Sequence, residues 1–313
     1  MQKQPNIGIL MSVYKPDFDY FAQQLDSINL QNYPNAVLYV RNDFPSDTTI
    51  EPFVRKHLDN FPVVFLPSTK NIGYVASFEA LVKNADEDVF VFCDQDDIWE
   101  QGRLTRAVDY MLETGAVLVT CDRSIIDANG EIIEASFRDS HPKAYEVNWN
   151  TGDDITVRAA SSCHSIGMAT MVRADIAKQA LPFPSHTAHD LWVTLIASEL
   201  GKVAFLTDCL VKYRRHGENV SGTLTNVATK QDWIDTRVAP RLMTAREFCF
   251  RFPNSIHANK IAAFAHARET GSVWFLFKHR KASPAIAWFE IALHIVPTPI
   301  FSLVTNFIKK RSR

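Results

Sequence analysis

Three carboxylates stand within four positions at the end of an apolar run. Asp94, Asp96 and Asp97 come directly after the run Val89–Cys93. Asp94 and Asp96 are two residues apart, so in an extended backbone their side chains project to the same side and can converge on one ion. Carboxylate ligation suits Mg²⁺ or Mn²⁺, with phosphate and water completing the coordination. The spacing therefore predicts a divalent metal site, with a solvated acidic turn as the simpler alternative.

The run before these acids is β-branched and aromatic, and it is too short for a helix, which indicates a parallel strand covered on both faces. In open α/β sheets, ligands bind outside the carboxyl ends of the strands. Similar apolar runs, separated by helical spacings of apolar residues, occur earlier in the chain, at residues 7–14, 36–40 and 63–66. This alternation predicts an α/β fold with a mostly parallel central sheet and helices on both faces.

Polar residues follow each predicted strand and should line one rim of the sheet. They are Tyr14, Asp43, the loop at residues 70–73, and the acidic turn. Asp43 is a good acceptor for a ribose or a base edge, and Lys70 could offset phosphate charge. Neither a glycine-rich dinucleotide motif nor a P-loop follows the first strand, so a bound phosphate would be held through the metal.

Two stretches in the second half carry further candidates. Asp190 opens a predicted helix between His189 and Trp192, where a carboxylate could accept the proton of a hydroxyl. An acid in a first helical turn is also favourable in any protein. Arg214, Arg215 and His216 form a cationic stretch that suits a diphosphate, and a neutral histidine could be a further metal ligand. The simpler interpretation is a solvated basic turn.

The composition narrows the class of protein. The 313 residues carry a net charge of −2, which argues against a broad nucleic-acid-binding surface. The five cysteines are widely spaced and lie mostly in apolar runs, which is typical of buried thiols in a cytosolic protein. The amino terminus lacks the pattern of a secretory signal, so we expect a cytoplasmic location.

Taken together, these stretches resemble a family 2 glycosyltransferase of the GT-A fold, most closely the bacterial rhamnosyltransferase branch. The resemblance covers residues 7–222. It rests on the order of six motifs: Ser12-Val13-Tyr14, Asn42-Asp43, Lys70-Asn71-Ile72-Gly73, the segment at residues 93–99, His189-Asp190-Leu191-Trp192, and the segment at residues 213–221.

The resemblance implies a role for each candidate residue. Asp190 would be the general base of a single inverting step, in which an acceptor hydroxyl attacks the anomeric carbon opposite a departing diphosphate. Asp96 and His216 would bind Mg²⁺ or Mn²⁺. The nucleotide sugar would contact Val13, Tyr14, Asp43, Lys70, Asn71, Gly73, Asp94, Gln95 and Arg215. The acceptor would contact Trp99, His189 and Trp192.

We expect a GT-A domain over residues 1–224 and a helical region over residues 225–313. The resemblance divides the first into a nucleotide-sugar-binding half, 1–123, and an acceptor-binding half, 124–224. In the second, basic residues flank an interrupted apolar run, at 278–281 and 309–313. This pattern fits helices lying on the cytoplasmic face of the plasma membrane. Core packing or a homodimer interface are the alternatives.

The resemblance thus implies a metal-dependent inverting glycosyltransferase of cell-surface glycan synthesis, acting on a lipid-linked or polysaccharide acceptor. By resemblance to the branch, the donor would be dTDP-rhamnose. A UDP-hexose donor and a non-catalytic nucleotide-sugar-binding subunit remain open. A nucleotidyltransferase would be expected to carry a glycine-rich basic loop after its first strand, and residues 12–17 lack one.

Overall fold

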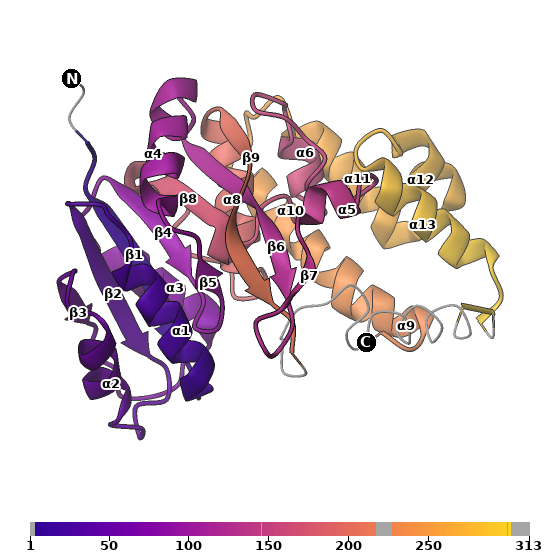
Figure 1. Cartoon of the computed structure of the whole chain (residues 1–313). Helices are drawn as coiled ribbons and strands as arrows, with labels where there is room; N and C mark the ends of the chain where they lie inside the picture. The colour runs from indigo at the N-terminus through magenta and orange to yellow at the C-terminus, as the bar shows by residue number, and fades with distance from the viewer. Residues whose placement is uncertain (1–3, 145, 217–226, 299, 302–313) are drawn as a thin grey trace. The chain divides into compact units, whose positions relative to one another are not determined.

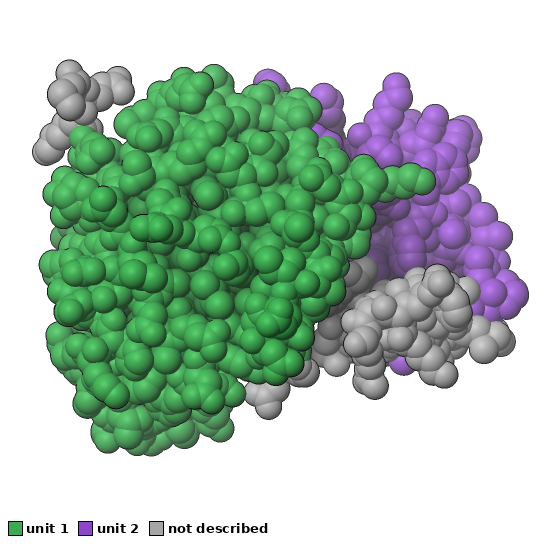
Figure 2. Space-filling view, viewed as in Figure 1, with its two compact units in different colours: residues 1–154, 163–216 green, residues 155–162, 217–313 purple. Residues whose placement is uncertain are grey.

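The computed structural model describes residues 4–144, 146–216, 227–298 and 300–301 (Figure 1). The chain divides into two compact units (Figure 2). Unit 1 comprises residues 1–154 and 163–216, and unit 2 comprises residues 155–162 and 217–313. The expected boundary at residue 224 lies outside the described residues.

Unit 1 is built on one nine-stranded sheet with the order β3-β2-β1-β4-β8-β6-β9-β5, and β7 pairs with β6. Its strands are β1 (Ile7–Val13), β2 (Ala36–Asn42), β3 (Val63–Phe65), β4 (Val89–Cys93), β5 (Ile98–Trp99), β6 (Leu118–Ile126), β7 (Ile132–Glu134), β8 (Thr170–Arg173) and β9 (Val203–Arg214). Its helices are α1 (Phe18–Asn29), α2 (Ile50–His57), α3 (Tyr74–Asn84), α4 (Arg103–Thr114), α5 (Phe137–Ser140), α7 (Ala174–Gln179) and α8 (His189–Leu200), with the 3-10 turn η1 (Gly167–Ala169).

The four apolar runs before the acidic turn form strands β1 to β4, which pair in parallel as predicted. β1 pairs in parallel with both β2 and β4, and β2 pairs in parallel with β3. Every side chain of β4 is buried, as a strand covered on both faces requires. Helices α1, α2 and α4 cover one face of the sheet, and α3, α7 and α8 cover the other (Figure 1). The expected α/β fold with helices on both faces is confirmed.

The second half of the sheet is mixed rather than parallel. β8 lies between β4 and β6 and is antiparallel to both. The long strand β9 pairs in parallel with β6 across two register shifts. The bulge bends β9 without ending it. As a result, the carboxyl ends of β4 and β9 bring the acidic turn and residues 214–216 to the same edge.

Unit 2 is helical, as expected for the C-terminal region. It contains α6 (Thr156–Ala159), α9 (Lys230–Trp233), the π-helical turn η2 (Ile234–Val238), α10 (Ala239–Arg251), α11 (Ala258–Thr270), α12 (Val273–His279) and α13 (Pro284–Ile295). A buried ion pair between Arg268 and Glu290, at 2.7 Å, joins α11 to α13. Within the described ranges, none of the helices has the length and apolar character needed to cross a membrane. The basic residues 309–313 lie outside the described residues.

Candidate active site

Carboxylates from two separate segments lie close together at the carboxyl end of β4. Burial, together with the negative charges of Asp96 and Asp190, raises the pKa of Asp94 to about 7. Asp96 lies on the same turn, whereas Asp190 comes from the start of α8, nearly one hundred residues later. His189, the neighbour of Asp190, packs edge-on against Phe92 of β4 at 4.8 Å. The fold therefore gathers the predicted metal ligand and the predicted base at one edge of the sheet.

The carboxylate of Asp190 is held by two backbone donors. The N–H of Gly167 donates to Oδ2 at 2.9 Å, and the N–H of Leu191 donates to Oδ1 at 2.7 Å. A carboxylate is favourable at this position because the first turn of a helix presents unpaired N–H groups. Each oxygen keeps capacity to accept a further hydrogen bond, such as one from a hydroxyl.

His189 is a buried neutral ring rather than an exposed contact. Its imidazole stacks on Phe78 with ring centres 3.8 Å apart. Neither ring nitrogen has a hydrogen-bond partner among the described residues. Burial lowers the pKa of His189 to about 4, although the charge of Asp190 acts in the opposite direction. In this structure His189 packs directly behind Asp190, and its contact with the acceptor stays a prediction.

Asp96 and His216 are paired, with 3.0 Å between Oδ2 and Nε2. Both side chains keep some exposure, 26% for Asp96 and 16% for His216. Among the described residues, no group of three or more histidine, cysteine or acidic side chains forms a ready metal cage. However, Mg²⁺ at nucleotide sites commonly uses one or two protein ligands together with phosphate oxygens. The accumulated negative charge at Asp94 and this O,N donor pair fit such a cation.

Arg214 is a buried structural residue. Its backbone N–H donates to Asp97 at 3.0 Å, and its Nε donates to the carbonyl of Asp96 at 2.9 Å. The guanidinium also donates to Gln23 and lies 4.4 Å from the ring of Tyr20. Arg214 therefore fastens the acidic turn to β9 and is not one of three donors facing a diphosphate. Arg215 remains partly exposed and pairs with Glu134 at 3.3 Å.

Asp43 organises the loop before α3. Its two oxygens accept the N–H groups of Ile72 and Gly73, both at 2.9 Å, and it forms a buried ion pair with Arg41. Only 2% of Asp43 is exposed. Gly73 adopts a φ of 81°, a conformation that favours glycine, and caps α3. In this arrangement Asp43 holds the wall of the predicted nucleotide site, and its oxygens are already engaged by the protein.

The other predicted nucleotide contacts lie along the same rim. Gln95 bridges to Tyr14, accepting from its N–H at 2.9 Å and donating to its carbonyl at 3.1 Å. The ring of Tyr14 is exposed, as are Lys70 and Asn71. Val13 is fully buried and takes part only through its carbonyl, which accepts from the N–H of Asp43 at 2.7 Å.

Two predicted acceptor contacts lie in the core. Trp192 is fully buried, and its Nε1 donates to the carbonyl of Ala180 at 2.7 Å. Trp99 is 3% exposed, and the guanidinium of Arg103 lies 3.9 Å from its ring. Neither indole reaches the surface in this structure, and their contact with the acceptor stays a prediction. The two indoles hold α8 and the acidic turn in place.

Sequence reasoning missed three residues that position the site. Arg41 has a recognisable signal, since it stands two residues before Asp43 on an extended strand and so shares its face. Arg103 is a buried cation whose charge lowers the pKa of Asp94, against the larger effect of burial. Neither Arg103 nor the Gly167 amide has a signal in the sequence, because both reach the acids through tertiary packing.

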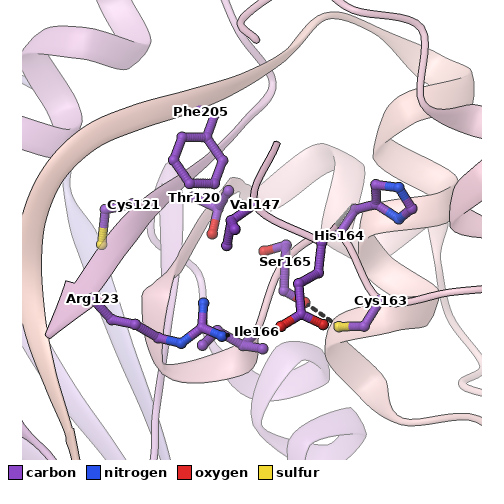
Figure 3. Close-up of a pocket in the computed structure, with 10 residues that line it drawn as sticks. Thr120, Cys121, Arg123, Val147, Cys163, His164, Ser165, Ile166 and Phe205 are labelled. Carbon is purple, nitrogen blue, oxygen red and sulfur yellow. Dashed lines mark hydrogen bonds and ion pairs between the residues drawn. The ribbon is translucent and has the colours of Figure 1, made fainter. Parts of the chain in front are cut away.

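A small cavity lies elsewhere in unit 1, beside β6 (Figure 3). Arg123 projects into it from β6, and the segment 163–166 forms another wall. Its volume of about 10 Å³ is room for about one water molecule. It cannot hold a nucleotide sugar, so the candidate site remains the open rim around Asp94, Asp96 and Asp190.

Comparison with solved structures identifies the fold class. The chain aligns with S. aureus TarS 1-349 in complex with UDP-GlcNAc at a TM-score of 0.60 and 15% identity, covering 90% of this chain and 82% of that one. It aligns with the mannosyltransferase PcManGT from Pyrobaculum calidifontis, in complex with GDP-Man and Mn²⁺, at a TM-score of 0.60 and 14% identity, covering 100% and 82%. Both likenesses confirm the predicted GT-A fold.

Residues 9–178 match the glycosyl transferase family 2. The chain belongs to this family and is a glycosyltransferase, which confirms the resemblance noted from the motifs. It is similar to a putative teichuronic acid biosynthesis glycosyltransferase, TuaG, of Bacillus subtilis, with 22% identity over 74% of this chain and 89% of the relative. An uncharacterized glycosyltransferase of Methanocaldococcus jannaschii is 23% identical over 67% and 71%.

Proposed function

We propose that this protein is a metal-dependent inverting glycosyltransferase that moves a sugar from a nucleoside diphosphate to an acceptor hydroxyl in cell-surface glycan synthesis. The observation that carries the proposal is the meeting of Asp94, Asp96 and Asp190 from two segments at one rim of the sheet. The similarity to TuaG, a putative glycosyltransferase of teichuronic acid biosynthesis, supports the glycan context.

The base assignment follows from what holds Asp190. With two N–H donors fixing its oxygens, the carboxylate can accept the proton of an acceptor hydroxyl as that oxygen bonds to the anomeric carbon. The bond between the anomeric carbon and the diphosphate oxygen breaks in the same step, and the nucleoside diphosphate leaves. Attack from the face opposite the leaving group inverts the anomeric centre. Such a base contributes about 10²–10⁴ in rate.

Asp96 and His216 would hold Mg²⁺ or Mn²⁺, which would neutralise charge on the departing diphosphate. The structure of a neighbour with Mn²⁺ and GDP-Man supports this choice of metal class. Arg215 and Lys70 lie along the rim with exposed cationic groups and would bind phosphate oxygens. Tyr14 and the loop held by Asp43 would contact the nucleoside.

For the donor we propose dTDP-rhamnose, from the resemblance of the motifs to the rhamnosyltransferase branch, with a lipid-linked or polysaccharide acceptor. UDP-hexoses are the second candidate, which the UDP-GlcNAc complex of TarS supports. A panel of dTDP-rhamnose, UDP-glucose, UDP-galactose, UDP-N-acetylglucosamine and GDP-mannose, assayed by donor hydrolysis with and without Mn²⁺, separates these donors.

The proposal expects metal-stimulated hydrolysis of one nucleotide class, with dTDP-rhamnose preferred. Preference for a UDP-sugar would show that the donor is a UDP-sugar, and the proposed class of reaction would be unaffected. Binding of a donor by calorimetry without hydrolysis or transfer to any glycan acceptor would favour the non-catalytic subunit instead. Equal rates in the presence of excess EDTA would overturn the metal assignment.

A further inference from the structure

Helix α13 presents an apolar face to the surface. Ala285, Trp288, Phe289, Ala292 and Ile295 are all exposed and recur at helical spacing. The opposite face of the helix is buried and contains Ile286, Ile291 and Leu293. A surface helix normally places its polar residues outward, so an outward stripe of tryptophan, phenylalanine and isoleucine marks an interaction surface.

Helix α12 extends this surface. Trp274 is 67% exposed, and Phe277 is 40% exposed. The ring of Phe277 meets that of Trp288 edge-on, with centres 5.9 Å apart, so the aromatic residues of the two helices are continuous. We call the exposed residues Trp274, Phe277, Trp288, Phe289 and Ile295 the hairpin surface.

Along the chain from α12 to residue 301, the exposed charges are all positive. Lys278 and Lys281 are exposed, and Arg280 lies 3.9 Å from the ring of Phe277. The only acid between residues 270 and 301 is Glu290, which is buried and paired with Arg268 at 2.7 Å. After residue 301 the sequence contains two lysines, two arginines and no acid.

We propose that the hairpin surface binds the headgroup region of an anionic membrane. Tryptophan and phenylalanine are suited to the boundary between headgroups and acyl chains, and neighbouring cations are attracted to anionic lipid. A second copy of the chain is a poorer partner, because a two-fold contact would set the same cations against one another. The proposal rests on unit 2 alone and is independent of the donor and acceptor.

Vesicle flotation with the full chain tests the proposal. The vesicles are phosphatidylcholine alone and phosphatidylcholine with about 30% phosphatidylglycerol, at low and high salt. The variants are Trp274→Ser with Trp288→Ser, and Lys278→Gln with Lys281→Gln. Phe250→Ser and Lys260→Gln are matched controls, since both side chains are exposed on other helices of unit 2.

We expect binding to the anionic vesicles that weakens in high salt and is lost on neutral vesicles. Removing the two lysines should weaken it about 25-fold, at about fivefold for each cation. Removing both tryptophans should weaken it by about tenfold or more. The controls should bind like the wild type, and unchanged circular dichroism melts should show that every variant is folded.

Three results would overturn the proposal. The wild type could fail to float with anionic vesicles. The control variants could lose binding as much as the hairpin variants, which would remove the assignment to this surface. The wild type could sediment as an oligomer that the double tryptophan variant dissociates, without any vesicle binding, which would identify the surface as a contact between copies. Activity on soluble donors would be unaffected in each case, so the proposed function is tested separately.

Discussion

Replacing His189 with phenylalanine should make the protein more resistant to acid. His189 is enclosed by Phe78 and Phe92, and neither ring nitrogen has a hydrogen-bond partner among the described residues. The unfolded chain takes up the histidine proton near pH 6.5, whereas the folded protein does so only near pH 4, because burial lowers the pKa of His189. Between these values the unfolded state binds more protons, so the free energy of unfolding falls as the pH falls.

The size of the effect follows from the pKa difference. A pH of 5.0 lies about 1.5 units below the pKa of His189 in the unfolded chain. Each of these units lowers the free energy of unfolding by about 1.36 kcal/mol. His189 therefore accounts for a loss of about 2 kcal/mol, or about 4–8 °C in Tm for a unit of this size. His189→Phe and His189→Gln should both lack this loss. Comparing the two pH values within each variant cancels the packing change that the substitution introduces.

Thermal melts of the wild type, both variants and His266→Phe measure this difference. His266 is exposed on α11, so a variant at this position should lose as much stability between pH 7.5 and pH 5.0 as the wild type does. The reasoning is refuted if His189→Phe loses as much stability between pH 7.5 and pH 5.0 as the wild type does. Transfer by His189→Phe should stay within about tenfold of wild type, because the proposed role of this ring is to support Asp190 by packing, without proton transfer.

Two further substitutions test the site. Gly167→Ala should lower kcat about tenfold with little change in donor Kd: its Cβ would lie 3.0 Å from Nε2 of His189 and 3.8 Å from Cβ of Asp190, displacing the base. An equal loss of donor affinity would contradict this. His216→Ala should raise the Mn²⁺ concentration needed for half-maximal activity by about 10–100-fold, because removing a metal ligand or a residue that orients one typically weakens metal binding by that factor. A metal titration unchanged from wild type would remove His216 from the metal site.

The parallel half of the sheet was predictable because its strands are buried on both faces and read as continuous apolar runs. The acids that end those strands were predictable for the same reason, since Asp43, Asp94 and Asp96 follow strands that all end at one edge. The antiparallel β8 was not, because residues 161–173 mix small, polar and apolar types without a clear period. The position of β8 depends on its partners β4 and β6.

Side-chain burial was the harder part to predict. Arg214 and Arg215 are adjacent and of one type, yet Arg214 is fully buried while Arg215 stays partly exposed beside Glu134. The difference comes from the direction of the last residue of β9, which turns toward the acidic turn. Trp99 and Trp192 stand next to site motifs in the sequence, but packing of α4 and α8 carries both rings into the interior.

The central claim is that Asp190 removes the acceptor proton at a rim where Asp96 helps to hold the donor. The most direct test is Asp190→Asn, measured in parallel by calorimetric donor binding with Mn²⁺ and by transfer to acceptor. The account predicts donor affinity within about threefold of wild type and transfer lowered by about 10²–10⁴. Transfer at the wild-type rate with intact binding would contradict it.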